Sequence, residues 1–436
     1  MSIKNKIIVV IAEVVSRVIK TFGLGSGSTW PGEIALRLNP QFIKEVLKDS
    51  STKIILIAGT NGKTTTSKLI RFILEKNGHK VFQNNEGANL LNGVASTLVR
   101  QEALLHFGGA IGIFEVDENS LPLVLKQMQP RAIVLLNLFR DQLDRYGEVN
   151  IIADKWKESI QQLPSTTSLM LNGDDPQIAF LGKDIKATTH FFGINHKHLT
   201  PKDIPHDVDS TYCPQCGQRL IYSEMSYSHL GNYHCEACGF RRPRVITYSD
   251  DILSSSLHGI YNIYNITAAV LLLTIVFGIE IDDITKYLKE FKPAFGRQEQ
   301  LEYKGRTITI QLSKNPAGFN QSVSVAQEII EKNGGNILLV LNDRIPDGTD
   351  ISWIWDVELE EIRKFTEKVF VSGDRVYDMA LRMKYGGFEK IETDEVLENA
   401  IEKVVSATPE GGTVVILCTY SAMLEVRQLV VGRRLL

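Results

Sequence analysis

The sequence predicts a multi-domain α/β protein built around parallel sheets. Short apolar segments of strand type alternate with helical segments from residue 54 to about 180, and again from residue 306 onwards. Such alternation is typical of parallel strands joined by crossover helices. The length of 436 residues corresponds to roughly three domains. The 48 Lys and Arg residues nearly balance the 51 Asp and Glu residues, so nothing indicates a general attraction to nucleic acid.

The first 48 residues are expected to be helical, with a loop at the Gly/Ser-rich segment 23–32. Their apolar run, residues 7–15, is too short to span a bilayer and contains Glu13, and no small-residue cleavage site of a signal peptide follows it. At helical spacing the apolar side chains share one stripe, made of Ile7, Val10, Ile11, Val14, Val15 and Val18. We expect this stripe to pack on its own domain, and contact with a membrane surface is the alternative.

A phosphate-binding loop follows the first strand-like segment. Residues 54–66 read IILIAGTNGKTTT and lead into the helical pattern SKLIRFILEKNG. The glycine spacing is G-x-x-G-K-T, shorter than the common G-x-x-x-x-G-K-[ST]. A tight turn with a solvated lysine is the alternative, but a turn rarely needs two glycines, a lysine and three threonines together. The segment therefore predicts an ATP site.

The roles within this loop follow from its chemistry. Backbone N–H groups would surround the phosphates, the Lys63 ammonium would offset their charge, and the Thr64 hydroxyl would bind Mg²⁺. The nucleotide-binding residues expected here are Gly59, Thr60, Asn61, Gly62, Lys63, Thr64 and Thr65. The next buried strand, near 109–116, ends in Phe114-Glu115-Val116-Asp117, which places carboxylates where metal ligands usually lie in such sheets.

Four of the five cysteines form a second constellation. Cys213-Pro-Gln-Cys216 and Cys235-Glu-Ala-Cys238 are two C-x-x-C pairs separated by 18 residues. This spacing allows four thiolates to close around Zn²⁺, and a site with four protein ligands is structural. Disulfides are the alternative, but a cytosolic nucleotide enzyme keeps its thiols reduced. A zinc ribbon can also bind nucleic acid, yet only one small basic cluster, at 241–244, lies nearby, so stapling an inserted loop is favoured.

These features divide the chain into three parts. Residues 1–48 form an N-terminal helical segment, residues 49–298 a central ATP-binding domain with a zinc-ribbon insertion at about 205–247, and residues 299–436 a C-terminal α/β domain. The third part contains no phosphate loop of its own.

Several segments in fixed order resemble the Mur ligase family of ATP-dependent amide-forming enzymes. They are GTNGKTT, NLFRDQLDRYGEVNIIADKW at 137–156, LNGDDP at 171–176, GIYNIYNITAA at 259–269 and the pair Gly296-Arg297. The resemblance covers about residues 30–436 and implies a central P-loop domain followed by a Rossmann-like domain. It also implies that Thr64 and Glu115 hold Mg²⁺, that Asn265 meets the nucleotide and that Arg297 meets the phosphates. Lys155 aligns with a lysine that many members carbamylate to hold a second metal, and a solvated helix lysine is the alternative.

Two departures from the family pattern concern the acceptor chemistry. The family's Asp-His pair is here Asp141-Gln142, which removes an imidazole ligand although the amide oxygen of glutamine still suits Mg²⁺. The family's Asp-Tyr-Ala-His-Asn-Pro segment reads Gln-Leu-Ser-Lys-Asn-Pro at 311–316. This change indicates an amine site that differs from that of amino-acid-adding relatives, and it is consistent with ammonia as the nucleophile.

Within the family, the chain most resembles ligase subunits that amidate lipid II. The four-cysteine ribbon, EVDENSLP, LSKNPAGFNQ and DGTDISWIWD carry this likeness. It implies that ATP phosphorylates the α-carboxylate of D-glutamate in the stem peptide and that ammonia then displaces phosphate to give D-isoglutamine. We expect a cytoplasmic protein, and the lipid-linked substrate leaves a position at the inner face of the membrane open.

We expect the ammonia to come from a separate subunit. Only Cys418 remains outside the zinc cluster, in a buried strand pattern that indicates a core residue, so the chain lacks its own glutaminase. The resemblance implies a GatD-like glutamine amidotransferase as partner. We expect it to dock on the C-terminal domain at the exposed-looking loop 347–350, next to Trp353 and Trp355. Asp350 would orient the partner's catalytic histidine, and a plain Asx-turn is the alternative.

Two other function classes remain open from the sequence. One is an amino-acid-adding ligase of the muramyl-peptide or folylpolyglutamate type, which differs from an amidating enzyme in the mass of its product. The other is a non-catalytic, ATP-dependent binding module that uses its ribbon to recruit nucleic acid or protein. Phosphate release that depends on an acceptor carboxylate would exclude this second class.

Overall fold

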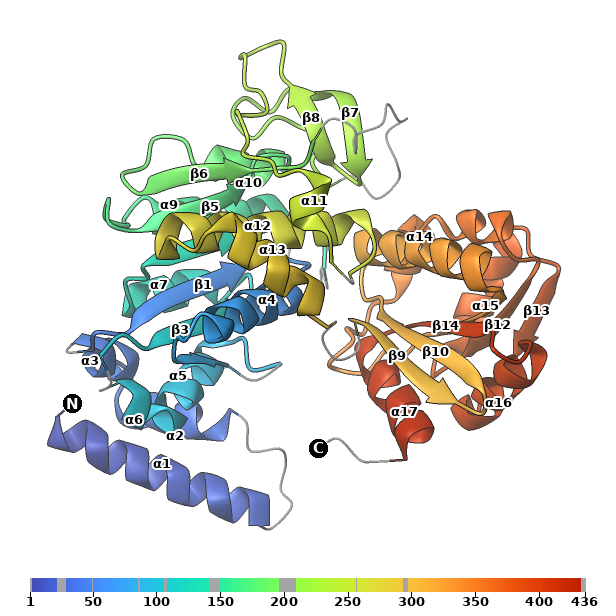
Figure 1. Ribbon diagram of the computed structural model, residues 1–436, viewed down its shortest axis with the longest axis horizontal. Helices are drawn as coiled ribbons and strands as arrows, with labels where there is room; N and C mark the ends of the chain where they lie inside the picture. The colour runs from blue at the N-terminus through green and yellow to red at the C-terminus, as the bar shows by residue number, and fades with distance from the viewer. Residues whose placement is uncertain are drawn as a thin grey trace.

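The protein consists of two α/β lobes and a small ribbon, as Figure 1 shows. The structure is a computed structural model. It describes residues 2–21, 29–48, 50–84, 87–105, 108–141, 149–195, 209–255, 257–292 and 297–432. Each lobe has one six-stranded sheet, and the ribbon has two strands. The predicted α/β class with parallel sheets is confirmed.

The N-terminal segment is helical, as expected, and consists of α1 (Ile3–Thr21), α2 (Trp30–Leu38) and α3 (Phe42–Lys48). The expected loop at 23–32 is wrong at its end, because Trp30 already begins α2. The expected packing of the α1 stripe is also wrong. The side of α1 that packs against the protein consists of Asn5, Ile8, Val9 and Ala12. The stripe lies exposed on the opposite side, with Ile7, Val10, Ile11, Val14 and Val18 each at least 41% accessible. Helical spacing alone could not choose between two apolar faces.

The central sheet has the order β2-β3-β1-β4-β5-β6, and all its strand pairs are parallel. Its strands are β1 (Lys53–Ala58), β2 (Val81–Gln83), β3 (Ile111–Val116), β4 (Ala132–Leu135), β5 (Ser168–Asn172) and β6 (Thr188–Phe192). One face packs on α4 (Lys63–Lys76), α12 (Ile260–Phe277) and α13 (Ile281–Glu290). The other packs on α5 (Leu91–Arg100), α7 (Leu121–Gln127), α9 (Val149–Ile160) and α10 (Pro176–Leu181), with the short α6 (Glu102–Leu105) following α5.

Helix α12 is the one described helix whose length and apolarity would also suit a membrane span. Its 18 residues are 61% buried inside the protein, and its apolar side chains complete the core beside α4. It therefore functions as a core helix that fixes the position of the residues on its first turns.

The ribbon follows β6 and consists of β7 (Ile221–Tyr227) and β8 (Leu230–His234), which pair in antiparallel fashion. A short helix, α11 (Asp250–Leu253), leads from it to α12. The ribbon lies at the β5 and β6 side of the central sheet, on the end away from α1 (Figure 1).

The second lobe has the strand order β13-β12-β11-β14-β10-β9, in which only the β9 and β10 pair is antiparallel. Its strands are β9 (Arg297–Tyr303), β10 (Arg306–Leu312), β11 (Gly335–Val340), β12 (Lys368–Ser372), β13 (Lys390–Thr393) and β14 (Thr413–Cys418). Helices α14 (Pro316–Asn333) and α15 (Val376–Tyr385) cover one face, together with the 3₁₀ segments η2 (Ser352–Asp356) and η3 (Leu359–Lys364). Helices α16 (Leu397–Ala407) and α17 (Tyr420–Val431) cover the other.

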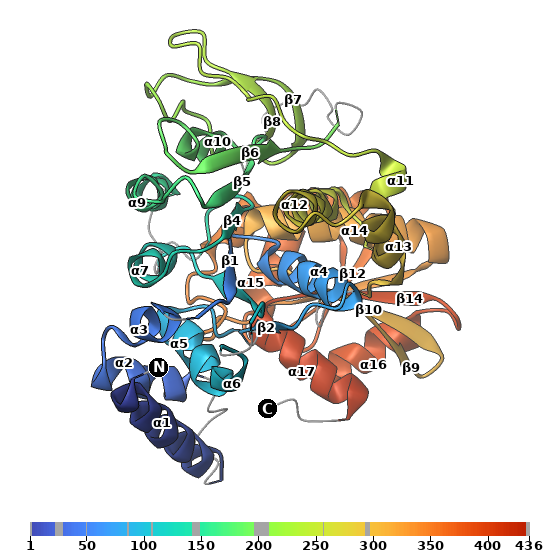
Figure 2. The ribbon, with the colours of Figure 1, turned by 60° about the vertical axis from the view of Figure 1, so that its left-hand side comes forward.

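The predicted boundary between residues 298 and 299 falls inside β9, because this strand begins at Arg297 and pairs with β10. The second lobe therefore starts before the predicted position. Both ribbon views place α14 next to α12 at the junction of the two lobes (Figures 1 and 2).

Candidate nucleotide and metal sites

The phosphate loop connects β1 to α4 and packs tightly against its neighbours. Gly59 and Gly62 have φ angles of +140° and +91°, which favour glycine. A Cβ on Gly62 would lie 2.1 Å from Oδ1 of Asn265 on α12. The side chain of Asn265 therefore lies directly against the loop, and its contact with the nucleotide stays a prediction.

Asn137, which follows β4, holds the loop from the other side. Its Oδ1 accepts a hydrogen bond from Asn61 N at 2.8 Å, its Nδ2 donates to Asn61 O at 3.1 Å, and its own carbonyl accepts from Thr60 N at 3.0 Å. These bonds fix two residues of the loop in place, so that its free N–H groups are oriented before a ligand binds.

Thr64 and Glu115 lie together at the start of α4. The Thr64 hydroxyl donates to Oε2 of Glu115 at 2.7 Å, and the Ser67 hydroxyl donates to Oε1 at the same distance. Glu115 is 7% exposed. A buried carboxylate beside a hydroxyl offers the hard oxygen donors that Mg²⁺ prefers, so this pair fits a magnesium ion.

Further charges surround the mouth of the loop. Lys63 Nζ donates to the carbonyls of Gly59 and Thr60 and lies 3.4 Å from Glu118 Oε2. Lys314 Nζ, from the second lobe, forms an ion pair with Asp141 Oδ2. Burial raises the pKa of Asp141, and the Lys314 ammonium opposes this rise. The other carboxylate oxygen of Asp141 is buried and has no hydrogen-bond partner within the described part of the chain.

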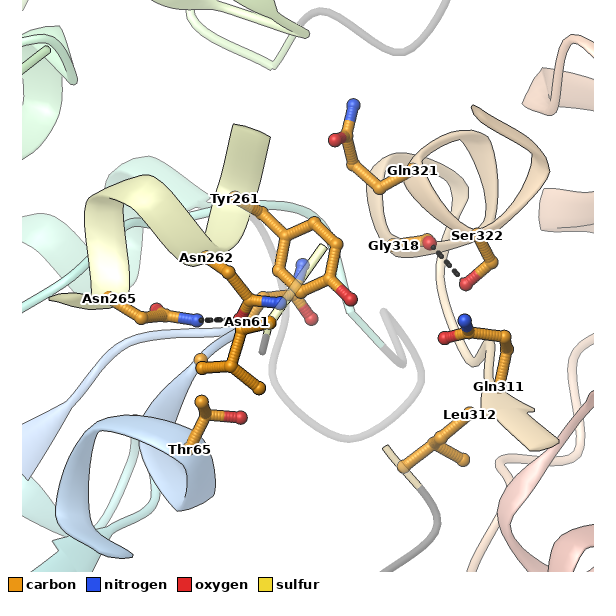
Figure 3. Close-up of a pocket in the computed structure, with 12 residues that line it drawn as sticks. Asn61, Thr65, Tyr261, Asn262, Asn265, Gln311, Leu312, Gly318, Gln321 and Ser322 are labelled. Atoms are coloured by element: carbon orange, nitrogen blue, oxygen red, sulfur yellow. Dashed lines mark hydrogen bonds between the residues drawn. The ribbon is translucent and has the colours of Figure 1, made fainter. Parts of the chain in front are cut away.

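A cleft opens beside the loop, between the two lobes (Figure 3). One wall comes from the phosphate loop and the segment leading into and along α12, and the other from β10 and α14. The lining residues are Asn61, Gly62, Thr65, Leu257, Tyr261, Asn262, Asn265, Gln311, Leu312, Gly318, Gln321 and Ser322. In Figure 3 the polar side chains of Asn262 and Gln311 approach the space from opposite walls. The cleft therefore adjoins the phosphate loop on the side of Asn265.

Not every predicted residue joins this group. Lys155 is exposed on α9, while the neighbouring Trp156 is buried and donates from Nε1 to the Glu118 carbonyl at 2.7 Å. The exposed Lys155 side chain agrees with the solvated-lysine alternative, and its role as a carbamylated metal ligand stays a prediction. Gln142, Gly296 and the side chain of Arg297 lie outside the described residues.

The four predicted cysteines come together in the ribbon. All four sulfur atoms lie within 4.8 Å of one another, with Cys213 and Cys238 at 3.6 Å and Cys216 and Cys235 at 3.5 Å. Ligands about 2.3 Å from a tetrahedral zinc ion lie about 3.8 Å apart. The cluster can therefore hold one metal ion.

The expected docking loop is only partly exposed. Asp347 is buried and accepts hydrogen bonds from Ser421 N at 2.7 Å and Ser421 Oγ at 2.5 Å, so its expected exposure is wrong. Asp350 is exposed, and its Oδ1 accepts from Ser352 N at 2.8 Å, which is the Asx-type alternative. Trp353 packs on Phe319, with ring centroids 6.0 Å apart.

Four residues of the site were not singled out from the sequence, namely Ser67, Glu118, Asn137 and Asn262. Asn137 carried a usable signal, because it directly follows an apolar strand segment whose carboxyl end had to meet the phosphate loop. Ser67 lies one helical turn after Lys63 and so shares its side of α4. For Glu118 and Asn262 no local pattern separates them from ordinary surface residues.

Two family models match the chain, the "Mur ligase middle domain" over residues 57–273 and the "MurT ligase C-terminal" model over residues 312–423. The chain is 33% identical over 409 residues to the MurT subunit of lipid II isoglutaminyl synthase (glutamine-hydrolyzing) from Staphylococcus aureus, covering 89% of this chain and 90% of that one. It is 31% identical over 431 residues to the subunit of the same name from Streptococcus pneumoniae, covering 94% of each.

Solved structures share the fold. A pseudomurein peptide ligase type C from Methanothermus fervidus matches with a TM-score of 0.67 and 24% identity, covering 89% of this chain and 81% of that one. The MurF ligase of Thermotoga maritima in complex with ADP matches with a TM-score of 0.62 and 18% identity, covering 91% and 82%.

The close approach of Gly62 and Asn265 can be tested with variants of two glycines that flank α4. Gly62→Ala should lower the affinity for Mg·ADP by at least about tenfold, because the added Cβ must displace Asn265 or the loop. Gly78→Ala is the matched control, since Gly78 also has positive φ, at +80°, but has no atom within 4 Å of the added Cβ. Both variants carry similar backbone strain, so equal loss of ADP binding in a titration would contradict the proposed contact.

Proposed function

This chain belongs to the MurT family of Mur ligase-like subunits, and on that basis we propose that it amidates the D-glutamate α-carboxylate of the lipid II stem peptide at the expense of ATP. The observation that carries the proposal is the match to MurT subunits over about 90% of the chain, combined with a phosphate loop whose Thr64 faces Glu115. The enzyme is an ATP-dependent carbon–nitrogen ligase of peptidoglycan synthesis.

The reaction needs activation because a carboxylate is a poor acyl donor. An oxygen of the α-carboxylate attacks the γ-phosphorus of ATP, ADP leaves, and an acyl phosphate forms. Ammonia then attacks the acyl carbon. The bond between this carbon and the phosphate oxygen breaks, phosphate leaves, and the nitrogen loses one proton. The protein contributes positioning and charge compensation at both steps.

The described residues divide these tasks. The loop from Gly59 to Thr65 binds the phosphates, and Lys63 exchanges its carbonyl contacts for phosphate oxygens. Thr64 and Glu115 would hold Mg²⁺, which supplies charge neutralisation at the phosphates. Asn265 would orient the nucleoside in the cleft, and Arg297 would contact the phosphates from the lobe junction.

The four-cysteine cluster is assigned to zinc. Its sulfur distances suit a tetrahedral ion, and all four ligands come from the protein, so the ion has a structural role. Cys213, Cys216, Cys235 and Cys238 would hold it.

A separate subunit would supply the ammonia. Cys418 is fully buried, and burial raises the pKa of its thiol, which makes it a poor nucleophile for glutamine hydrolysis. The relatives are named as subunits of a glutamine-hydrolyzing synthase. We assign the release of ammonia to a GatD-like glutamine amidotransferase that forms a heterodimer with this chain.

An apolar patch on the second lobe suits such a partner. Trp355 is 49% exposed and stacks edge-on against Tyr385, with ring centroids 5.6 Å apart. Leu381 and Tyr377 are exposed one and two turns before Tyr385 on the same helix, α15. Trp355 lies five residues after Asp350, which keeps the patch and the exposed carboxylate close in the chain. Large exposed aromatic groups of this kind are typical anchors of interfaces.

The N-terminal helix gives the protein a surface for the membrane. The exposed side of α1 carries Ile3 together with five residues of the apolar stripe, Ile7, Val10, Ile11, Val14 and Val18. Lys4 lies at one edge of the stripe, and Lys6 and Arg17 lie at the other, all three exposed to solvent. An apolar stripe between cations is typical of helices that lie on anionic lipid surfaces. We infer a cytoplasmic enzyme that works at the inner face of the membrane, where its lipid-linked substrate is anchored.

The proposed reaction is tested by mass spectrometry of lipid II, or of a muramyl peptide, after incubation with ATP and ammonium. Amidation should lower the acceptor mass by about one unit, whereas an added amino acid would raise it by on the order of a hundred.

Lys63→Ala and Glu115→Ala should each reduce the rate by at least about 10²-fold. Lys155→Ala should retain the wild-type rate, because the Lys155 side chain is exposed to solvent. Wild-type turnover in both loop variants would refute the proposed site.

The partner assignment predicts that the chain alone uses ammonium but not glutamine. In the complex, Trp355→Ala should weaken glutamine-dependent amidation by at least about tenfold, through lost interface burial, while ammonium-dependent amidation stays unchanged. Asp350→Asn should also weaken glutamine-dependent amidation and leave ammonium-dependent amidation unchanged, while the variant still binds the partner. Val396→Asp is the control, since Val396 is 54% exposed and precedes α16 on the opposite face of the sheet. Glutamine-dependent amidation by the single chain would overturn the two-subunit assignment.

The membrane assignment predicts that the protein sediments with vesicles containing about 30% anionic phospholipid and less with neutral vesicles. The double variant Ile7→Glu and Val14→Glu should abolish sedimentation, because it places two charges in the exposed stripe. Leu123→Glu on α7 is the control, since Leu123 is 47% exposed elsewhere on the surface. If the stripe variant and the wild type sediment equally, α1 does not contact lipid.

A further inference from the structure

The tip of the ribbon hairpin is buried, although hairpin tips normally lie in solvent. Strands β7 and β8 are joined at Ser228 and His229, and Ser228 has a φ angle of +46°. Ser228 is 5% exposed, and His229 and Leu230 are fully buried. The four cysteines lie at the opposite, outer end of the ribbon, where Cys216 is exposed. The ribbon therefore inserts its tip into the central lobe.

His229 contacts two residues that line the route to the phosphate loop. Its Nε2 lies 3.3 Å from Asp175 Oδ2, and its ring packs on Phe139 with centroids 4.7 Å apart. The same oxygen of Asp175 accepts a hydrogen bond from Leu138 N at 2.9 Å. The tip thus fixes the segment that follows Asn137.

That segment is bonded directly to the phosphate loop. Phe139 N donates to Thr60 Oγ1 at 3.0 Å, and the Thr60 hydroxyl donates back to the Phe139 carbonyl at 3.1 Å. Both residues are nearly fully buried. One residue, Phe139, therefore separates the ribbon tip from the loop that holds the nucleotide.

A second route leads from the ribbon to Asn265. The Ser226 hydroxyl on β7 is hydrogen-bonded to Tyr264 OH at 2.8 Å, and Tyr264 OH donates to Asp174 Oδ2 at 2.8 Å. Arg242, which follows the last cysteine pair, donates from Nε to Asp174 Oδ1 at 2.7 Å. Tyr264 immediately precedes Asn265 on α12, so these bonds hold the first turns of that helix.

We propose that the four-cysteine ribbon is a metal-dependent support of the nucleotide site, in which His229 positions the phosphate loop and Ser226 positions Asn265. The inference rests on the proposed function in taking a nucleotide as the ligand of the loop. The hydrophobic core around the cysteines is small, formed by Cys213, Leu220, Tyr233, Cys235 and Ala179. A unit of this size gains much of its folding free energy from its metal. Loss of the ion therefore releases the hairpin tip and lowers nucleotide affinity.

The test measures ADP affinity and metal content together, on the full chain. His229→Ala should lower ADP affinity by about tenfold while the metal content stays at one ion, because His229 is at the far end of the ribbon from the cysteines. Tyr212→Ala, on the exposed surface of the ribbon, should change neither value, since Tyr212 is 64% accessible. Cys238→Ser should lower both, and hydrogen exchange should then speed up at residues 59–66 and 137–141.

The outcomes separate this inference from the proposed function. Wild-type protein that fails to bind ADP would overturn the proposed function and this inference with it. Wild-type protein that binds ADP, beside a His229→Ala variant with equal affinity and unchanged metal content, would overturn the inference alone. Because His229→Ala leaves all four cysteines in place, it carries the test even if Cys238→Ser does not fold. His229→Gln, which places an amide N–H group near Asp175, should recover part of the affinity.

Discussion

The site depends on the parallel register of three central strands. Ala58 at the end of β1 pairs with Val116 of β3 on one side and with Leu135 of β4 on the other. The segments that leave these strands therefore start at the same level of the sheet. The phosphate loop, the carboxylates after β3 and Asn137 after β4 meet for this reason, and a slip of one residue would turn each strand's side chains to the opposite face.

This constraint explains what could be predicted from the sequence. The phosphate loop, Glu115 and the four cysteines are recognisable because their chemistry requires fixed spacing in the chain or a fixed place at a strand end. Lys155 could not be placed in this way, because the direction of its side chain depends on how α9 packs. Helix α9 buries Trp156, which donates to the Glu118 carbonyl, and leaves the preceding Lys155 exposed, a rotation that is set by tertiary packing.

The same distinction applies to surfaces. Helix α1 has apolar residues around most of its circumference, so its periodicity fits two opposite faces, and the packing of Asn5 and Ala12 selects the one that is buried. In the sequence, Asp347 of the docking loop looks like a surface carboxylate. In the structure it is buried and accepts two hydrogen bonds from Ser421, which is 74 residues away in the chain. Contacts between distant segments are the part of the structure that local patterns do not contain.

Lys314 connects the chemistry of the site to the arrangement of the two lobes. It belongs to the second lobe, yet it is paired with Asp141 of the central lobe. Among the described residues, the mouth of the loop brings together the carboxyl groups of Glu115, Glu118 and Asp141 and the ammonium groups of Lys63 and Lys314. A divalent cation bound at Glu115 adds positive charge here, so binding of the metal and of the anionic nucleotide favour each other. Because the Lys314 ammonium comes from the second lobe, the charge around the phosphate loop depends on the contact between the two lobes.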